Sequence, residues 1–149
     1  MKKIILFATL PVLFLFACED DSAETVTVDS SQPTGEFMSQ RGGTFVEQNG
    51  TGTMGMAELG TDEDGEQFLY FGTDFQTNLG TGTVTIFLST SEEFMADPMQ
   101  GNPDLKLVGS VSMNGASYYK ISPAAESKYT HVILWCASAS IPFGYAPLQ

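Results

Sequence analysis

Positive charge is scarce in this chain of 149 residues, which carries 6 Lys and Arg against 18 Asp and Glu and has a net charge of −12. Nucleic-acid binding depends on clustered Lys and Arg that neutralise phosphates, and an acidic surface repels such a polyanion. The composition therefore excludes DNA and RNA as partners.

Ligands for metal ions are also scarce, since the chain has one His and two Cys. Structural zinc sites need four Cys or His ligands, and blue-copper sites need two His and one Cys. Both classes of site are excluded. The sequence also has no Gly-x-Ser-x-Gly elbow and no phosphate-binding loop, so no hydrolase or transferase signature is present. Whether the protein is an enzyme stays open.

The N-terminus has a short apolar run, in which Met1-Lys2-Lys3 is followed by an almost uninterrupted apolar stretch from Ile4 to Phe16. A helix of that length would extend about 20 Å, which is short of the roughly 30 Å hydrocarbon core of a bilayer. A basic start followed by a short apolar segment is typical of a secretory signal peptide. We therefore predict that residues 1–17 are a signal peptide and take no part in the fold.

The end of this segment, Leu15-Phe16-Ala17-Cys18, resembles the lipobox of bacterial lipoproteins. The resemblance implies that Cys18 becomes the acylated N-terminal residue, whereas the alternative is an ordinary cleaved signal that Cys18 follows by chance. Two or more acyl chains hold a protein stably on a membrane without crossing it. Cys18 is thus the predicted lipid attachment site. The predicted location is the cell envelope, at the outer membrane, on its periplasmic or its surface face.

Two regions of different composition follow the signal peptide. Residues 18–42 are rich in acidic and small polar residues and have little to pack, which predicts a disordered acidic linker. In residues 43–149, short stretches of alternating apolar and polar residues are separated by Gly and Asn, the pattern of antiparallel strands. The sequence therefore predicts an all-β fold, an antiparallel β-sandwich of about eight strands.

Individual strands can also be assigned. Asn49-Gly50 is typical of tight turns, so we expect residues 44–48 and 52–59 to form a hairpin around it. The stretch from His131 to Cys136 is the most apolar and predicts a central strand. Two further strands are expected to turn alternate residues toward the core, through Val84, Ile86 and Leu88 in one and Leu105, Leu107, Val111 and Met113 in the other.

The C-terminal strands carry a more specific resemblance, in Val132-Ile133-Leu134-Trp135-Cys136 and Phe143-Gly144-Tyr145-Ala146-Pro147-Leu148. They resemble the DM-thirteen domain, which ends in a Trp-Cys strand followed by Phe-Gly-x-Ala-x-Leu. The match extends over roughly Thr44 to Leu148. The resemblance implies a β-sandwich related to the haem- or sugar-binding DOMON domains, and a role in electron transfer that centres on the cysteine. The chain departs from the family where Gly80-Thr81-Gly82-Thr83 replaces Gly-Pro-Asp.

Cys136 is the redox candidate. If Cys18 is acylated, Cys136 has no intramolecular partner, and a solitary thiol in an oxidising compartment is open to oxidation. Cys136 shares a strand face with Val132 and Leu134, however, so an inert core thiol is the favoured alternative. Trp135 lies on the opposite face, where it packs or relays an electron beside the thiol.

His131 is a weak candidate for a cofactor ligand, as an axial haem ligand with one of the methionines 54, 56 or 113 as the second. A histidine at the rim of a strand and methionines that fill a core are the favoured alternatives. The acidic run Asp62, Asp64 and Glu66 resembles part of a calcium loop but lacks the acid at its twelfth position, so a solvated acidic turn is favoured. No metal site is predicted, and the cofactor is unknown.

The sequence as a whole predicts a membrane-anchored extracytoplasmic lipoprotein with a DM-thirteen-like domain and a redox or electron-transfer role at the cell envelope. Its expected partners are membrane lipid, bound through acylated Cys18, and a redox or envelope protein. The alternative is a non-catalytic binding or structural module that presents an acidic β-sandwich to a protein, glycan or cationic partner.

Overall fold

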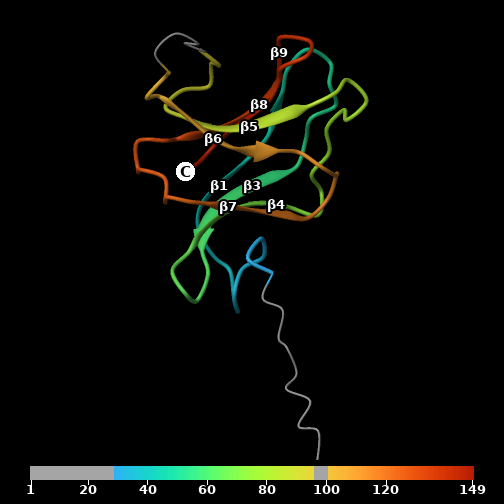
Figure 1. The fold of residues 1–149 in the computed structure, drawn as a ribbon. Helices are drawn as coiled ribbons and strands as arrows, with labels where there is room; N and C mark the ends of the chain where they lie inside the picture. Colours follow the sequence, from blue (N-terminus) through green and yellow to red (C-terminus); the bar gives the residue numbers. More distant parts are fainter. Residues whose placement is uncertain (1–28, 96–100) are drawn as a thin grey trace, which may run out of the picture.

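The computed structural model describes residues 29–95 and 101–149, in which two antiparallel sheets pack face to face (Figure 1). The predicted all-β sandwich is therefore confirmed, with nine strands among the described residues. The predicted signal peptide and Cys18 lie outside these residues. Within the described ranges, no helix has the length and apolar character needed to span a bilayer.

The two sheets have four and five strands. The order of the first is β1-β3-β4-β7, with bounds Met38–Thr44, Met56–Thr61, Gln67–Phe71 and Ser117–Ile121. The order of the second is β2-β9-β8-β5-β6, with bounds Val46–Glu47, Ile141–Pro147, His131–Cys136, Val84–Ser89 and Leu105–Ser110. β8 is the middle strand of its sheet, which confirms the prediction from its apolar sequence.

The core lies between the sheets, because each strand turns alternate side chains inward and the two inner faces interdigitate. Three phenylalanines form its aromatic part, with ring centroids 4.3 Å apart for Phe71 and Phe75 and 5.3 Å apart for Phe45 and Phe71. The fully buried members are Ala57, Leu69, Phe71, Phe75, Val84, Ile86, Leu88, Val132, Leu134, Cys136, Phe143 and Ala146.

The hairpin predicted around Asn49-Gly50 forms only at its base, where Thr44 pairs with Met56 and Phe45 N donates to the Gly55 carbonyl oxygen at 2.9 Å. Asn49 and Gly50 both have the positive φ expected of a tight turn, 59° and 67°. The chain that enters the turn, however, pairs with β9, where Val46 lies opposite Tyr145, while β3 pairs with β1. The turn therefore lies within the connection between β1 and β3, and the expected pairing of residues 46–48 with the returning arm is wrong. The local pattern identified the reversal correctly, but strand partners depend on the core, in which buried Phe45 fixes the chain between β1 and β2.

The first strand begins at Met38, so the disordered linker predicted for residues 18–42 is wrong in its last part. β1 pairs with β3 through backbone hydrogen bonds, which need no apolar side chains and leave no trace in the composition. Arg41 adds a bond from Nη1 to the carbonyl oxygen of Tyr129 at 2.8 Å. Phe37 precedes the strand and lies 5.5 Å from Tyr118, ring to ring.

Two residues expected in the core lie outside it. The side chains of Leu107 and Met113 are 63% and 55% exposed. Leu107 lies in β6, an edge strand, directly opposite Phe87 on the outer face of the sheet. The alternation of apolar residues did predict a strand, but alternation by itself does not say which of the two faces of that strand is buried.

Replacing Leu134 tests the assignment of the core. Leu134→Ala should lower the free energy of unfolding by about 2–5 kcal/mol, because it opens a cavity at a fully buried site. Leu107→Ala is the matched control, and its effect should stay within about 0.5 kcal/mol. Urea denaturation measures both, and equal losses would show that Leu107 belongs to the core.

Candidate functional site

Cys136 is the last residue of β8 and lies between Val84 of β5 and Ile141 of β9. Its side chain faces the core and is fully buried, and among the described residues it is a free thiol. The burial predicted for this thiol is therefore confirmed. Because the residue ends its strand, its sulfur also meets the loops at that end of the sandwich.

Two hydroxyl side chains lie beside the sulfur. Cys136 Sγ is 3.2 Å from Ser138 Oγ and 3.7 Å from Thr81 Oγ1. Ser138 Oγ in turn donates to the carbonyl oxygen of Thr81 at 2.7 Å. In the thiol form the S–H can thus donate to Ser138 Oγ while Ser138 donates to Thr81. Ser138 is exposed, so this short chain of hydrogen bonds leads from the buried sulfur to the surface.

The pKa of the Cys136 thiol is held below its ordinary value, chiefly by the hydrogen bond with the Ser138 hydroxyl. The backbone N–H groups of Ala139 and Ser138 and the Thr81 hydroxyl act in the same direction, while burial opposes them. For Ser138 to donate to a thiolate, its hydroxyl must turn from the Thr81 carbonyl to the sulfur. Loss of the proton from Cys136 is therefore coupled to the orientation of Ser138.

Sequence reasoning missed both Thr81 and Ser138. Thr81 lies in the segment that departs from the family pattern, and Gly82 beside it has a φ of 109°. A Cβ at Gly82 would lie 2.8 Å from Ser138 Oγ, so the glycine permits the close approach of the two loops. Ser138 was open to prediction from its position two residues after the cysteine, but Thr81 is brought to the sulfur only by the pairing of β5 with β8.

Trp135 points to the outer face of the five-stranded sheet, away from Cys136, as the alternation of β8 predicted. Its indole stacks on the ring of Phe94, with centroids 4.1 Å apart and planes inclined by 19°. Phe94 also lies 5.0 Å from Phe87, centroid to centroid. The thiol and the indole are therefore neighbours in sequence that occupy opposite sides of one sheet.

His131 is half-buried on that same outer face, with Nδ1 2.9 Å from Thr130 Oγ1. The methionines considered as second haem ligands are exposed, and Met56 belongs to the other sheet while Met54 pairs with Gln76. The structure does not bring them together with His131 around a shared space. These residues do not fit axial haem ligation.

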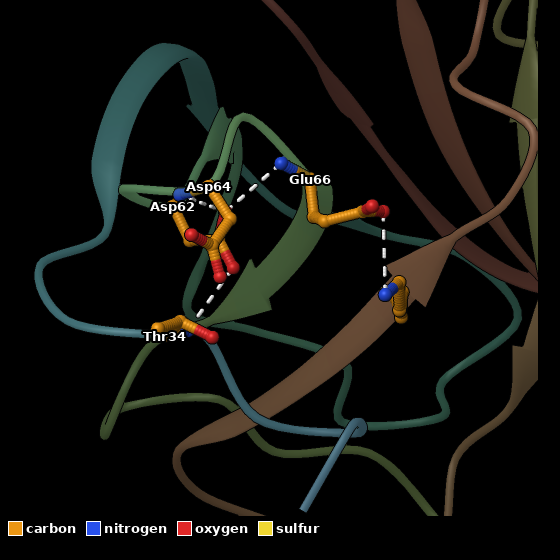
Figure 2. Close-up of polar contacts among 5 residues, drawn as sticks. Thr34, Asp62, Asp64 and Glu66 are labelled. Atoms are coloured by element: carbon orange, nitrogen blue, oxygen red, sulfur yellow. Dashed lines mark hydrogen bonds and ion pairs between the residues drawn. The ribbon is translucent and has the colours of Figure 1, made fainter. Parts of the chain in front are cut away.

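The acidic run is a structural turn between β3 and β4 (Figure 2). The Asp62 carboxylate accepts backbone N–H bonds from Thr34 at 3.0 Å, Asp64 at 3.0 Å and Glu66 at 2.9 Å. Asp62 is only 2% exposed, so the expectation of a solvated turn is wrong for this residue. Within the part of the chain that the structure describes, no group of three or more His, Cys, Asp or Glu side chains could hold a metal ion.

These bonds lower the pKa of Asp62 from its ordinary 3.8, with the bond from Thr34 as the largest cause and burial as the main opposing one. A lowered pKa in the folded state means that the carboxylate stabilises the fold above about pH 4, and that this contribution is lost as the pH falls through the lowered value. Because Thr34 precedes β1, the same carboxylate holds the N-terminal segment against the β3–β4 turn.

Asp62→Asn should lower the thermal unfolding midpoint at pH 7, since a neutral amide is a weaker acceptor for the three N–H groups. The difference from the unmodified chain should shrink as the pH falls from about 4 through the lowered pKa, where Asp62 becomes protonated in the folded state as well. Asp64→Asn, at an exposed position of the same turn, is the control and should change little. Thermal unfolding followed by circular dichroism measures both, and a pH-independent difference would contradict this account.

The comparisons with known proteins give one match. A family model described as electron transfer DM13 matches residues 44–148, a range that includes Thr81, Cys136 and Ser138. Comparison with curated proteins and with solved structures finds no match. The matched range takes in the described strands from β2 to β9 and covers most of the chain. The chain therefore belongs to the electron transfer DM13 family.

Proposed function

We propose that this protein transfers electrons outside the cytoplasm, with Cys136 as its redox group and acylated Cys18 as its membrane anchor. Membership of the electron transfer DM13 family supports the redox role. The observation that carries the assignment to Cys136 is the hydrogen-bonded path from its sulfur through Ser138 Oγ, at 3.2 Å, to the protein surface.

The proposed step is a proton-coupled loss of one electron. The Cys136 S–H gives its proton to Ser138 Oγ, the exposed Ser138 hydroxyl gives up its bond to the Thr81 carbonyl oxygen and releases its own proton to solvent, and the electron passes to a one-electron acceptor on a partner protein. The product is a neutral thiyl radical, and the reverse step restores the thiol. Burial of Cys136 favours this step over disulfide exchange, because exchange requires contact with another sulfur and electron transfer does not.

Oxidation by ferricyanide tests the redox role. In the chain from residue 18 onward with Cys18→Ala, reduced Cys136 should consume a stoichiometric amount of ferricyanide, and Cys136→Ser should abolish this reaction. The rate should rise with pH, and Ser138→Ala should move that rise to higher pH because the main cause of the lowered thiol pKa is removed. Ser110→Ala, at an exposed position of β6, is the control. Equal consumption by the Cys136→Ser chain would refute the role of Cys136.

The arrangement of the domain supports anchoring at its N-terminal side. The described chain begins at Asp29, and residues 29–37 lie near the turn between β3 and β4 (Figure 1). The turn between β8 and β9, which carries Ser138, lies at the opposite end of the sandwich (Figure 1). A membrane anchor that precedes Asp29 would thus leave the end with Cys136 accessible to a partner.

Substitution of Cys18 tests the anchor. The full chain with Cys18→Ala should leave the membrane fraction, because the acyl chains that hold the protein cannot be attached. Fractionation of cells with immunoblotting measures the distribution, and mass spectrometry of the mature N-terminus identifies the modification. Cys136→Ser, which keeps Cys18, should stay on the membrane. Unchanged membrane association of Cys18→Ala would contradict lipidation at this residue.

A second candidate function is that of a binding module. Complete burial of Cys136 favours it, because an enclosed thiol also suits a purely structural role. In this case the partner would bind at the surface of the sandwich and electron transfer would play no part.

A further inference from the structure

The outer face of the five-stranded sheet carries an apolar row that crosses all of its strands. Residues directly opposite one another in antiparallel strands share a face. The register places Leu107 opposite Phe87, Phe87 opposite Ile133, Ile133 opposite Tyr145, and Tyr145 opposite Val46. The outer face of an antiparallel sandwich is ordinarily polar, so an apolar row across the full width of the sheet is unusual.

Further aromatic side chains extend this row. Phe94 lies over the sheet, stacked on Trp135 and next to Phe87. The outer patch, as we define it, consists of Val46, Phe87, Phe94, Leu107, Ile133, Trp135 and Tyr145. Ile133 in the middle of the row is fully buried although it lies outside the main core, Leu107 and Val46 at the two edges are 63% and 45% exposed, and the aromatic members are half-buried. Apolar side chains that stay partly exposed together on one face mark interaction sites.

Acidic side chains lie near the outer patch, whose face also carries Thr85, opposite Trp135, and His131, 6.1 Å from Tyr145 between ring centroids. Glu92 acts on the Tyr145 hydroxyl and raises the pKa of that tyrosine. Glu93 follows Glu92 in the same loop. Both are exposed. The carboxylates of this loop thus lie next to the patch.

The Lys and Arg side chains that the structure describes lie away from the outer patch. Arg41 is in β1 and bonds the Tyr129 carbonyl, Lys120 pairs with Glu66 at 3.2 Å, and Lys128 pairs with Glu126 at 3.4 Å. Lys106 lies in β6 opposite Leu88, whose side chain is in the core, so it belongs to the other face of the strand. Among the residues that the structure describes, the outer patch therefore has carboxylates with no Lys or Arg beside them.

This combination of carboxylates and apolar side chains indicates which kind of partner could bind the outer patch. A second copy of the chain would bring its own carboxylates against those of the first, and an anionic lipid surface would be repelled in the same way. A glycan requires many hydrogen-bonding groups, and of the seven patch residues only Trp135 and Tyr145 carry one. A protein segment with Lys or Arg next to apolar side chains complements both the apolar row and the carboxylates of Glu92 and Glu93.

We infer that the outer patch is a docking surface for a basic, apolar segment of a partner protein, with Leu107, Phe87 and Trp135 receiving its apolar side chains and Glu92 facing its cations. Aromatic rings beside a carboxylate also attract Lys and Arg through their faces. The inference concerns the face of β8 opposite to Cys136 and does not depend on the redox role of the thiol.

Trp135 is the single tryptophan of the chain and reports directly on the patch. The probe is a capped peptide of alternating Lys and Leu, added to the chain from residue 18 onward with Cys18→Ala. Trp135 fluorescence should change with saturation, and the affinity should fall as salt is added. A capped peptide of alternating Glu and Leu should produce no change.

Variants localise the binding. Leu107→Lys should weaken binding of the Lys-Leu peptide by about tenfold, because it removes an exposed apolar contact and adds a repelling charge. Met38→Lys places the same charge at a 53% exposed position of β1 in the other sheet and should leave affinity nearly unchanged. Unfolding midpoints confirm that both variants are folded.

Four outcomes would overturn the inference. They are no response to the Lys-Leu peptide, an equal response to the Glu-Leu peptide, equal weakening by Leu107→Lys and Met38→Lys, and a Trp135 response to phosphatidylcholine vesicles in place of the peptide. Dimerisation in sedimentation experiments that Leu107→Lys abolishes would assign the patch to a second copy instead. The ferricyanide reaction of Cys136 is measured separately, so either proposal can fail without the other.

Discussion

Closure of two antiparallel sheets over one dry core is the constraint on which the rest of the structure depends. Among the described residues no disulfide contributes, so the fold relies on burial of side chains such as Phe71, Phe75 and Leu134. Once the sheets are closed, every residue of β8 has a fixed side. Cys136 faces the core and Trp135 faces outward because the side chains of a strand alternate.

Polar groups at the ends of the sandwich complete the closure, since the backbone of a turn must find partners where strands stop. Asp62 satisfies three N–H groups at one end and fastens the segment that precedes β1. Elsewhere, the hydroxyls of Thr51, Thr53 and Thr77 form a buried chain with spacings of 2.9 and 2.8 Å, and Thr51 also bonds the Phe143 carbonyl. Such fully satisfied networks specify one arrangement of the loops.

The central strand thereby separates two chemical environments by the thickness of a single sheet. On the core side the Cys136 thiol lies in hydrogen-bond contact with Ser138, while on the outer side Trp135 belongs to an apolar surface beside Glu92. A partner bound on the outer side would lie one sheet away from Cys136 without contacting its sulfur. Because the two proposals use opposite faces of β8, electron transfer and partner binding can both be functions of this protein, or either can apply without the other.

The sequence by itself determined the features that depend on local pattern and composition: the all-β class, the central position of β8, the burial of Cys136, the opposite orientation of Trp135 and the acidic charge. It also carried the resemblance to the family. Strand pairing was decided only by the tertiary structure, because alternation does not identify a partner or say which face is covered. For that reason residues 46 and 47 next to the Asn49-Gly50 turn paired with β9, Leu107 lay outside, and Thr81 came to the sulfur from a distant loop.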